Sequence, residues 1–211
     1  MGLVDADYKF IYIDVGCNGR ISDGGVFRNG HLSKALEQNT FKVPPAEILP
    51  QSEKRLPFVV VGDDAFPLKN YLMKPYPHQG LPREQRIFNY RLSRARRIVE
   101  NAFGILAYRF RVFMSAIHLP PDKIESIVLA ACVLHNYLRT TSAPRYTPPG
   151  SLDRVNKDGT VENGNWREGG CLQSIPKQGS NFYSKDAKQV RDEYCAYFNS
   201  NGRVSWQDSC I

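Results

Sequence analysis

The longest regular pattern of apolar positions begins near residue 82 and repeats at steps of three and four residues. Its members are Phe88, Leu92, Ala95, Val99, Ala102, Leu106 and Phe110. This spacing predicts an amphipathic helix over about 82–112, because residues three and four apart share one helical face. A similar pattern predicts a second helix over about 121–139, with Ile124, Ile127, Val128, Ala131, Leu134 and Leu138 facing inward. Both helices are expected to pack on a sheet.

Two segments have the pattern of strands. Residues 8–15 alternate and are rich in β-branched and aromatic side chains, and the turn-forming stretch 5–7 precedes them, so we expect a strand entered from a hairpin. Residues 57–62 begin as a continuous apolar run, which predicts a strand covered on both faces in a central position of a sheet. The proline-containing stretch 42–56 is expected to be the loop that leads into it.

Shorter elements complete the first two thirds of the chain. Ser22 or Asp23 can accept the free amides at the start of a short amphipathic helix. The apolar positions of that helix are Val26, Phe27, Leu32 and Leu36. A short helical turn is expected at 67–73, and prolines and a glycine keep 74–80 irregular.

The last third of the sequence has a different composition. Residues 140–183 contain few clustered apolar side chains, so they are expected to form a flexible linker or tail. A last helix is predicted at 184–199, closed by Gly202. The predicted organisation is one α/β domain at 1–139, the flexible linker at 140–183 and a C-terminal helix with its tail at 184–211.

Composition and charge narrow the functional classes. The chain has 211 residues, a net charge of +7 and a pI near 9.2, so its surface favours polyanions such as DNA. We find neither an apolar stretch long enough for a membrane helix nor a secretory start. The five scattered cysteines have no zinc-ligand spacing and indicate reduced thiols. A nuclear or cytoplasmic protein without a membrane partner is expected.

Two carboxylates stand out as candidate chemistry. Asp63 follows Gly62 at the end of the apolar strand, and Glu100 lies within the first long helix. Hard cations such as Mg²⁺ or Mn²⁺ prefer oxygen ligands held by rigid elements, so Asp63 and Glu100 are candidate metal-binding and catalytic residues. Asp64 points to the opposite face of a strand and is the weaker candidate. The alternative is that Asp63 only caps the next turn.

Basic residues surround Glu100 along the same helix. Arg94, Arg96, Arg97 and Arg111 are candidate nucleic-acid-binding residues, because guanidinium groups contact phosphates in bidentate fashion. The alternative is a solvated face on which Glu100 pairs with Arg96 or Arg97.

The histidines and the remaining motifs give weaker signals. His135 lies beside a core position and is better explained as a hydrogen-bonded packing residue than as a ligand. His31, His78 and His118 have no acidic or cysteine partners at ligand spacing. Serine and thiol hydrolysis, and a glycine-rich phosphate loop, have no support in the sequence.

Taken together, several motifs resemble the DDE endonuclease domain of Harbinger-type transposases and their domesticated relatives. They are Val4-Asp5-Ala6 to Gly16, Ser22-Asp23-Gly24-Gly25-Val26-Phe27, Val61-Gly62-Asp63-Asp64-Ala65-Phe66-Pro67-Leu68, Phe88-Asn89, Arg94 to Gly104 and Val133-Leu134-His135-Asn136. The resemblance covers about 3–139, and the ending from Tyr197 to Gln207 is also similar to the tail of such proteins.

The resemblance implies a ribonuclease-H-like α/β fold and two divalent ions held by three carboxylates, which activate water or a 3′-hydroxyl against a DNA phosphate. Asp63 corresponds to the second acidic residue of the family and Glu100 to the third. The first lies in a strand ending in Asp-Gly-x-His, upstream of the segment that Val4-Asp5-Ala6 resembles.

We therefore expect a truncated copy of the domain that lacks its first strand and most of its second, and a poor catalyst. The alternative is a catalytically silent descendant that binds DNA or a protein. No helix-turn-helix or zinc finger is recognisable, so target choice would lie upstream or in a separate DNA-binding partner protein.

Overall fold

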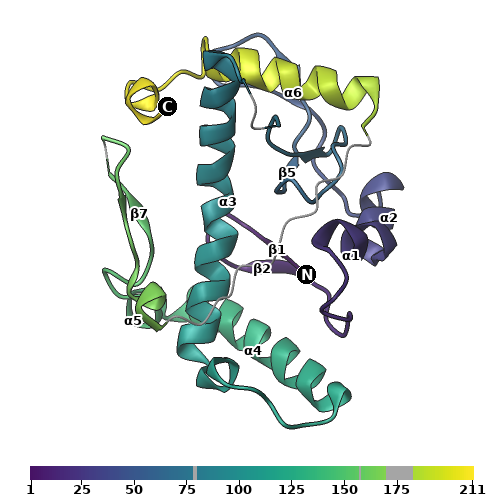
Figure 1. Cartoon of the computed structure of the whole chain (residues 1–211), viewed down its shortest axis with the longest axis vertical. Coiled ribbons are helices and arrows are strands. Elements are labelled where there is room, and N and C mark those ends of the chain that lie inside the picture. The colour runs from purple at the N-terminus through teal and green to yellow at the C-terminus, as the bar shows by residue number, and fades with distance from the viewer. Residues whose placement is uncertain (78–79, 157, 170–182) are drawn as a thin grey trace. The chain divides into compact units, whose positions relative to one another are not determined.

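The structure is a computed structural model that describes residues 1–77, 80–156, 158–169 and 183–211 (Figure 1). The chain divides into two compact units. Unit 1 comprises Met1–Arg20, Arg97–Asn156 and Thr160–Pro176, and unit 2 comprises Ile21–Arg96, Lys157–Gly159 and Lys177–Ile211. The helix α3 (Arg83–Arg109) contributes its first half to unit 2 and its second half to unit 1.

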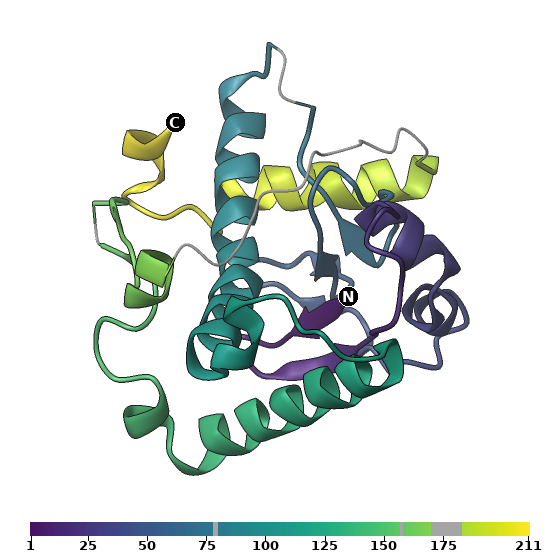
Figure 2. The same cartoon turned by 60° about the horizontal axis from the view of Figure 1, so that its bottom comes forward.

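Unit 1 combines a β-hairpin with helices. Its elements are β1 (Gly2–Val4), β2 (Phe10–Ile13), the second half of α3, the 3₁₀ turn η1 (Arg111–Met114), α4 (Pro121–Thr141), α5 (Ala143–Tyr146), β7 (Arg154–Val155), β8 (Val161–Glu162) and the 3₁₀ turn η2 (Asn165–Gly169). The pairs β1–β2 and β7–β8 are antiparallel. Figure 2 shows the β1–β2 hairpin lying along α4.

Local hydrogen bonds explain why the hairpin forms and where it lies. Asp5 Oδ1 accepts the backbone N–H groups of Asp7 and Lys9 at 2.9 Å each, which closes the turn. The side-chain amide of Asn136 on α4 bonds both the N–H and the C=O of Phe10 at 2.8 Å. Phe10 then packs with Ala102, Leu106, Ala131 and Cys132 in the core of unit 1.

Unit 2 contains the short strands and the C-terminal helix. Its elements are α1 (Asp23–Asn29), α2 (His31–Glu37), β3 (Glu47–Ile48), β4 (Arg55–Leu56), β5 (Val60–Val61), β6 (Leu72–Met73), the first half of α3, α6 (Lys185–Phe198) and the 3₁₀ turn η3 (Gln207–Cys210). β3 and β4 pair antiparallel, whereas β5 and β6 pair in parallel. Ser22 caps α1, as predicted, through its hydroxyl and the N–H of Gly25.

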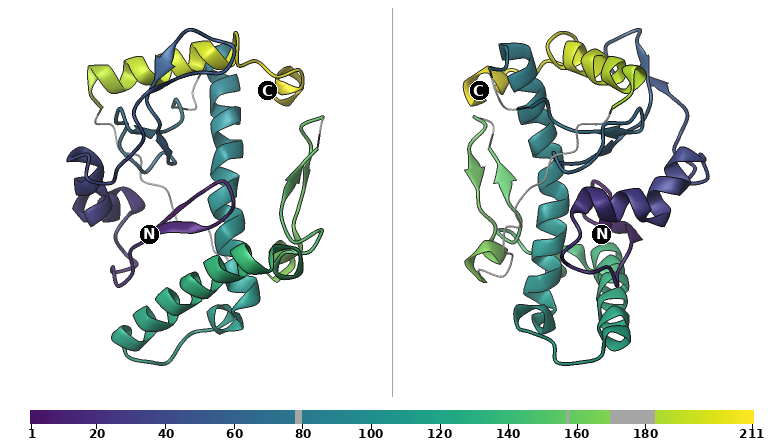
Figure 3. Two further views of the ribbon diagram at one scale, coloured as in Figure 1. Left: turned by 180° about the vertical axis from the view of Figure 1, so that it is seen from behind. Right: turned by 45° about the vertical axis from the view of Figure 1, so that its right-hand side comes forward.

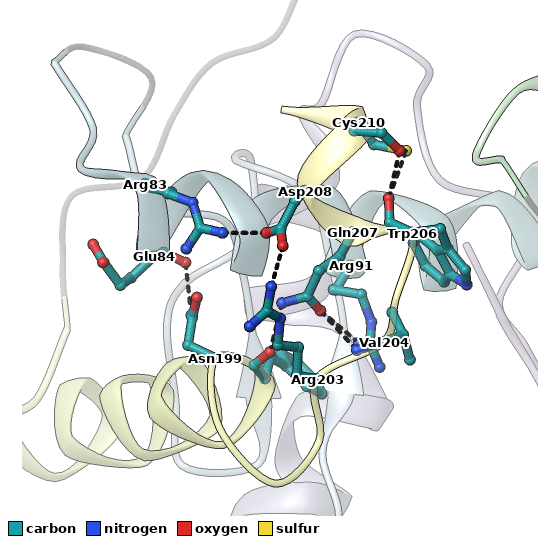
Figure 4. A network of polar contacts seen from close by, with 12 residues as sticks. Arg83, Glu84, Arg91, Asn199, Arg203, Val204, Trp206, Gln207, Asp208 and Cys210 are labelled. Carbon is teal, nitrogen blue, oxygen red and sulfur yellow. Dashed lines mark hydrogen bonds and ion pairs between the residues drawn. The ribbon is translucent and has the colours of Figure 1, made fainter.

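The core of unit 2 lies where α6 crosses the first half of α3 (Figure 3). Its buried members are Leu68, Met73, Tyr76, Phe88, Leu92, Ala187 and Cys195. The tail after α6 returns to α3 through polar contacts (Figure 4). Asp208 pairs with Arg83 and Arg203, and the Arg91 guanidinium donates to the carbonyl of Gly202 at 3.1 Å.

The α/β class predicted from the sequence is confirmed, but several elements differ. Within the described residues the sheets have two strands each, so the single mixed sheet expected from a ribonuclease-H-like fold is not seen. The run 57–62 yields only the two-residue strand β5, and Phe58 is 42% exposed rather than covered. The stretch 67–73 is not a helical turn but leads into β6.

The helical predictions are more accurate, with differences at their ends. The first short helix is two helices, α1 and α2, because the backbone at Gly30 is extended. α3 ends at Arg109, and the non-helical backbone of Phe110 separates it from η1. On α4 the predicted inward residue Leu134 is 49% exposed, while Cys132 and His135 are buried instead.

Residues 140–183 contain more local structure than their composition suggests. α5, β7, β8 and η2 form within this range, and residues 170–182 lie outside the described residues. The predicted flexibility of 140–183 remains a prediction. Among the described residues we find no α-helix whose length and hydropathy would let it span a bilayer.

Candidate functional site

Asp63 lies two residues after the end of β5, in unit 2. The backbone N–H of Gly62 donates to the carbonyl of Met73 at 2.9 Å, so the parallel pairing with β6 continues up to the residue before Asp63. α1 packs closely against the following turn, because a Cβ atom added at Gly24 would lie 2.0 Å from the carbonyl oxygen of Ala65. Asp63 is therefore placed at the carboxyl end of a parallel strand, where functional groups of α/β proteins commonly gather.

The carboxylate of Asp63 has one local and one distant neighbour. Oδ1 accepts the N–H of Ala65 at 3.0 Å, which is the turn-capping contact weighed from the sequence. Oδ2 lies 4.0 Å from Nη2 of Arg96, and the side chain is 14% exposed. Oδ1 thus stabilises the turn, and Oδ2 faces the guanidinium group of Arg96.

Lys74 is a charged residue near Asp63 that the sequence analysis did not identify. It follows β6 at the strand end beside Asp63 and is only 8% exposed. Its ammonium group donates to the carbonyl of Asp64 at 3.2 Å. Burial lowers the pKa of Lys74, while Asp64 and Asp63 act in the opposite direction. The parallel pairing of β5 with β6, which brings Lys74 to this strand end, was not evident from periodicity.

Glu100 lies on the second half of α3, in unit 1. Its side chain is 44% exposed, and Oε2 lies 3.8 Å from Nη2 of Arg167. Arg167 comes from η2, within the range expected to be flexible. The sequence pattern around Glu100 therefore did not predict Arg167 as its neighbour, because Arg167 lies far along the chain.

A buried carboxylate, Asp153, holds Arg167 in place. The two oxygens of Asp153 accept from Nε of Arg167 at 2.9 and 3.0 Å and from Nη2 at 2.6 Å. The N–H of Gly164 donates to Asp153 Oδ1 at 2.8 Å. Burial alone would raise the pKa of Asp153, but the bonds from Arg167 and Gly164 outweigh it and keep the pKa below its usual value. Asp153 is therefore ionised at neutral pH.

The structure separates the arginines that the sequence grouped as a DNA-binding face. The Arg94 guanidinium stacks on Trp206 at 3.8 Å within unit 2, and its Nη1 is buried. Arg96 faces Asp63. Arg97 also has a buried Nη1, which makes no hydrogen bond within the described residues. Arg111 is exposed in η1 and so is not on the α3 stripe.

The donor atoms of Asp63 and Glu100 have the chemistry that Mg²⁺ or Mn²⁺ requires, since both are partly exposed carboxylates. Each carboxylate also has an arginine within 4.0 Å, and this guanidinium group competes with a metal ion for the carboxylate. Across the described residues, no group of three or more acidic, histidine or cysteine side chains is gathered as a metal site. The two residues belong to different units.

His135 has the packing role predicted for it. It is fully buried in unit 1, with Nε2 2.7 Å from the Tyr8 carbonyl and Nδ1 2.9 Å from the Tyr146 hydroxyl. Because a carbonyl only accepts, Nε2 carries the proton and Nδ1 accepts from Tyr146. Burial lowers the pKa of His135 and raises that of Tyr146 to about 12. His78 lies outside the described residues.

Comparison with known proteins gives a family for the matched segment. The sequence model described as DDE superfamily endonuclease matches residues 1–136, which is more than half of the chain. "Protein ALP1-like" from Arabidopsis thaliana is 31% identical over 138 residues, covering 64% of this chain and 34% of that protein. "Putative nuclease HARBI1" from Homo sapiens is 36% identical over 80 residues, covering 36% of this chain and 23% of that protein.

The chain thus spans about a third of the length of the first relative and about a quarter of the second. No solved structure matches the chain. The matched segment includes Asp63, Glu100 and the hairpin, and it ends before Asp153 and Arg167. The resemblance to a Harbinger-type DDE domain that the motifs indicated is confirmed at the level of the family. The chain belongs to the DDE superfamily endonuclease family.

Proposed function

We propose that this chain is a transposase-derived DNA endonuclease domain that cleaves phosphodiester bonds with Mg²⁺ or Mn²⁺. The observation that carries the proposal is the position of Asp63 at the carboxyl end of the parallel strand β5, within the segment that the family matches. We also propose that the fold is ribonuclease-H-like, which the parallel β5–β6 pair and the antiparallel β1–β2 hairpin support.

The side chains near Asp63 support a role in substrate handling. The backbone N–H of Ala65 donates to Oδ1 of Asp63, so the turn fixes the orientation of the carboxylate and of its second oxygen, Oδ2. Lys74 adds a buried positive charge at the same strand end, which suits an anionic phosphodiester. Asp63 and Glu100 would each offer a carboxylate to divalent ions, which would supply Lewis-acid activation of the attacking and leaving oxygens.

We propose that the 211-residue protein is a weak catalyst by itself. It offers two carboxylates at motif positions, and each has an arginine within 4.0 Å that opposes cation binding. A hard divalent ion is held tightly only when several oxygen ligands converge on it.

A plasmid-nicking assay tests the endonuclease proposal. We expect slow nicking of supercoiled DNA with Mn²⁺ or Mg²⁺, abolished by EDTA and by Asp63→Asn or Glu100→Gln. The matched controls Asp186→Asn and Asp122→Asn remove one exposed carboxylate from each unit and should leave nicking unchanged. Nicking that survives both site variants would overturn the site assignment. Robust nicking that either site variant abolishes would overturn the expectation of weak catalysis.

The second candidate function is a catalytically silent DNA-binding descendant. The arginines facing Asp63 and Glu100 favour it, because they leave both carboxylates charge-compensated without a metal. DNA binding with no nicking under any metal condition would establish this function and exclude the first.

Two further expectations belong to the proposal. A separate DNA-binding protein would select the target sequence, and the protein would act in the nucleus, where its substrate is. Co-purification with nuclear DNA-binding proteins and imaging of a fluorescent fusion test them, and a fusion excluded from the nucleus would contradict the second.

A further inference from the structure

The segment after α5 places an arginine beside Glu100. Arg167 lies in η2, 67 residues away along the sequence from Glu100, yet its Nη2 is 3.8 Å from Glu100 Oε2. This segment lies beyond the residues 1–136 that the family matches. Arg167 is therefore a charged neighbour of the candidate site that neither the family match nor the motif analysis assigns.

The position of Arg167 is fixed by a buried polar network on α3. Asn101, adjacent to Glu100 and only 2% exposed, accepts the indole N–H of Trp166 at 2.8 Å and the backbone N–H of Asp153 at 3.0 Å. The Trp166 ring lies directly over Gly104, where an added Cβ would be 2.2 Å from the ring. The docking site for this segment is thus built into the helical turn that carries Glu100.

The guanidinium of Arg167 is held rigidly, but not all of its N–H groups are engaged by Asp153. Nε and Nη2 engage Asp153, whose side chain is fully buried, and the group stacks over Trp166 at 4.3 Å. The Arg167 side chain nevertheless remains 36% exposed. Within the described residues Nη1 makes no hydrogen bond, so its two N–H groups are available to a ligand. An arginine fixed in this way loses little side-chain entropy when it binds.

A second arginine in unit 1 adds positive charge near Asp153. Arg97 is close enough to Asp153 to lower the pKa of that carboxyl. Its Nη1 is buried and has no hydrogen-bond partner in the part of the chain that the structure describes. The guanidinium of Arg97 therefore adds positive charge near Asp153, which favours an anionic ligand in this region.

We propose that Arg167 contacts a backbone phosphate of DNA bound beside Glu100, with the charge of Arg97 adding to the attraction. The proposal rests on the proposed function only in taking DNA as the ligand. The phosphate replaces Glu100 as the second partner of Arg167, while Asp153 keeps the guanidinium in place. Arg167 is thus a substrate-binding residue contributed by a segment outside the matched family region.

Fluorescence anisotropy with a short labelled DNA duplex in EDTA tests this contact without cleavage. Arg167→Gln should weaken binding on the order of tenfold at low salt and reduce the slope of log K against log salt by about one, as expected for one lost phosphate contact. The matched control is Arg145→Gln, which removes the same charge from an exposed position of α5 in unit 1. An equal effect of both variants would overturn the proposal.

Two more variants separate direct contact from loss of structure. Asp153→Asn combined with Arg167→Gln neutralises both members of the ion pair, so the network is not left with an unpaired charge. Binding that stays weak in this double variant supports direct contact, whereas binding restored to the original level overturns it. Glu100→Gln removes the competing carboxylate and should strengthen metal-free DNA binding, and weaker binding would contradict the proposal.

The two proposals fail in different ways. Because the anisotropy experiment contains no divalent metal, absence of nicking does not affect its result. If the chain binds DNA through Arg167 but never nicks it, the contact stands and the endonuclease proposal falls. If Arg167→Gln leaves binding unchanged while Asp63→Asn abolishes nicking, the endonuclease proposal stands and the contact falls.

Discussion

The two units use different chemistry to attach a late part of the chain to α3. In unit 2, α6 docks through an apolar face, on which Ala187 and Cys195 are buried beside Phe88. In unit 1, the segment carrying Asp153 and Trp166 docks through hydrogen bonds to the buried amide of Asn101. The first attachment is mainly a continuation of the hydrophobic core, to which the hydroxyls of Tyr76 and Tyr194 add hydrogen bonds. The second is a polar network with a single large ring at its centre.

This difference determines what can be read from the sequence. An apolar helical face repeats every three or four residues, so the docking of α6 leaves a visible pattern. A buried polar network depends on individual donors and acceptors meeting in space and has no period. The polar network lies next to Glu100 and positions Arg167, whereas the described core residues of unit 2 do not include Asp63. The polar attachment, which is harder to predict from the sequence, is the one that contacts the candidate site residue Glu100.

The largest effect is expected from a charge placed in the apolar attachment. Ala187→Glu puts a carboxylate at a fully buried position, which costs several kcal/mol and should detach α6. Ala196→Glu on the exposed face of the same helix is the matched control and should change little. Urea unfolding followed by circular dichroism measures both, and equal midpoints would contradict the apolar description.

The polar attachment should be the next most sensitive. Asp153→Ala removes the partner of Arg167 and leaves the Gly164 N–H without an acceptor, so we expect a loss of about 3 kcal/mol. Trp166 fluorescence in a Trp206→Phe background reports on unit 1, because each unit has one of the two tryptophans. Asp7→Ala, at a side chain that is 77% exposed, is the control. A loss no larger than that of the control would show that the network does not stabilise unit 1.

A smaller effect is expected where the ring meets the helix. Gly104→Ala should push Trp166 out of place and destabilise unit 1 by about 1–3 kcal/mol, although alanine is the better helix former. Gly19→Ala, where an added Cβ meets nothing within 4 Å, should be neutral. The same fluorescence readout measures both variants, and a stabilised Gly104→Ala protein would mean that Trp166 does not pack there.

The smallest effect concerns pH and unit 1. Burial holds the pKa of His135 below its usual 6.5, so the unfolded chain takes up a proton before the folded one does. The free energy of unfolding should therefore be steady above about pH 6.5 and fall as the pH drops below it, by at most about 1.4 kcal/mol per pH unit. His135→Gln should flatten this dependence, whereas His118→Gln, at an exposed position, should not. An unchanged slope in His135→Gln would assign the acid sensitivity to other groups.

Much of the fold could be predicted because its signals are local. The helices α3, α4 and α6 follow from apolar spacing, and the cap of α1 follows from a serine at the right place. The hairpin follows from alternation and a turn sequence. The packing role of His135 was also predicted, because a single histidine beside apolar positions is usually a hydrogen-bonded core residue.

The sequence by itself determined the family motifs, the helices and the two candidate carboxylates, because each depends on residues that are close along the chain. The tertiary structure decided which charges surround those carboxylates. Lys74 reaches the strand end of Asp63 through the parallel pairing of β5 with β6, and Arg167 reaches Glu100 through Asp153 and Asn101. Such contacts require long loops to close on specific partners, and nothing in local spacing encodes which partner a loop will meet.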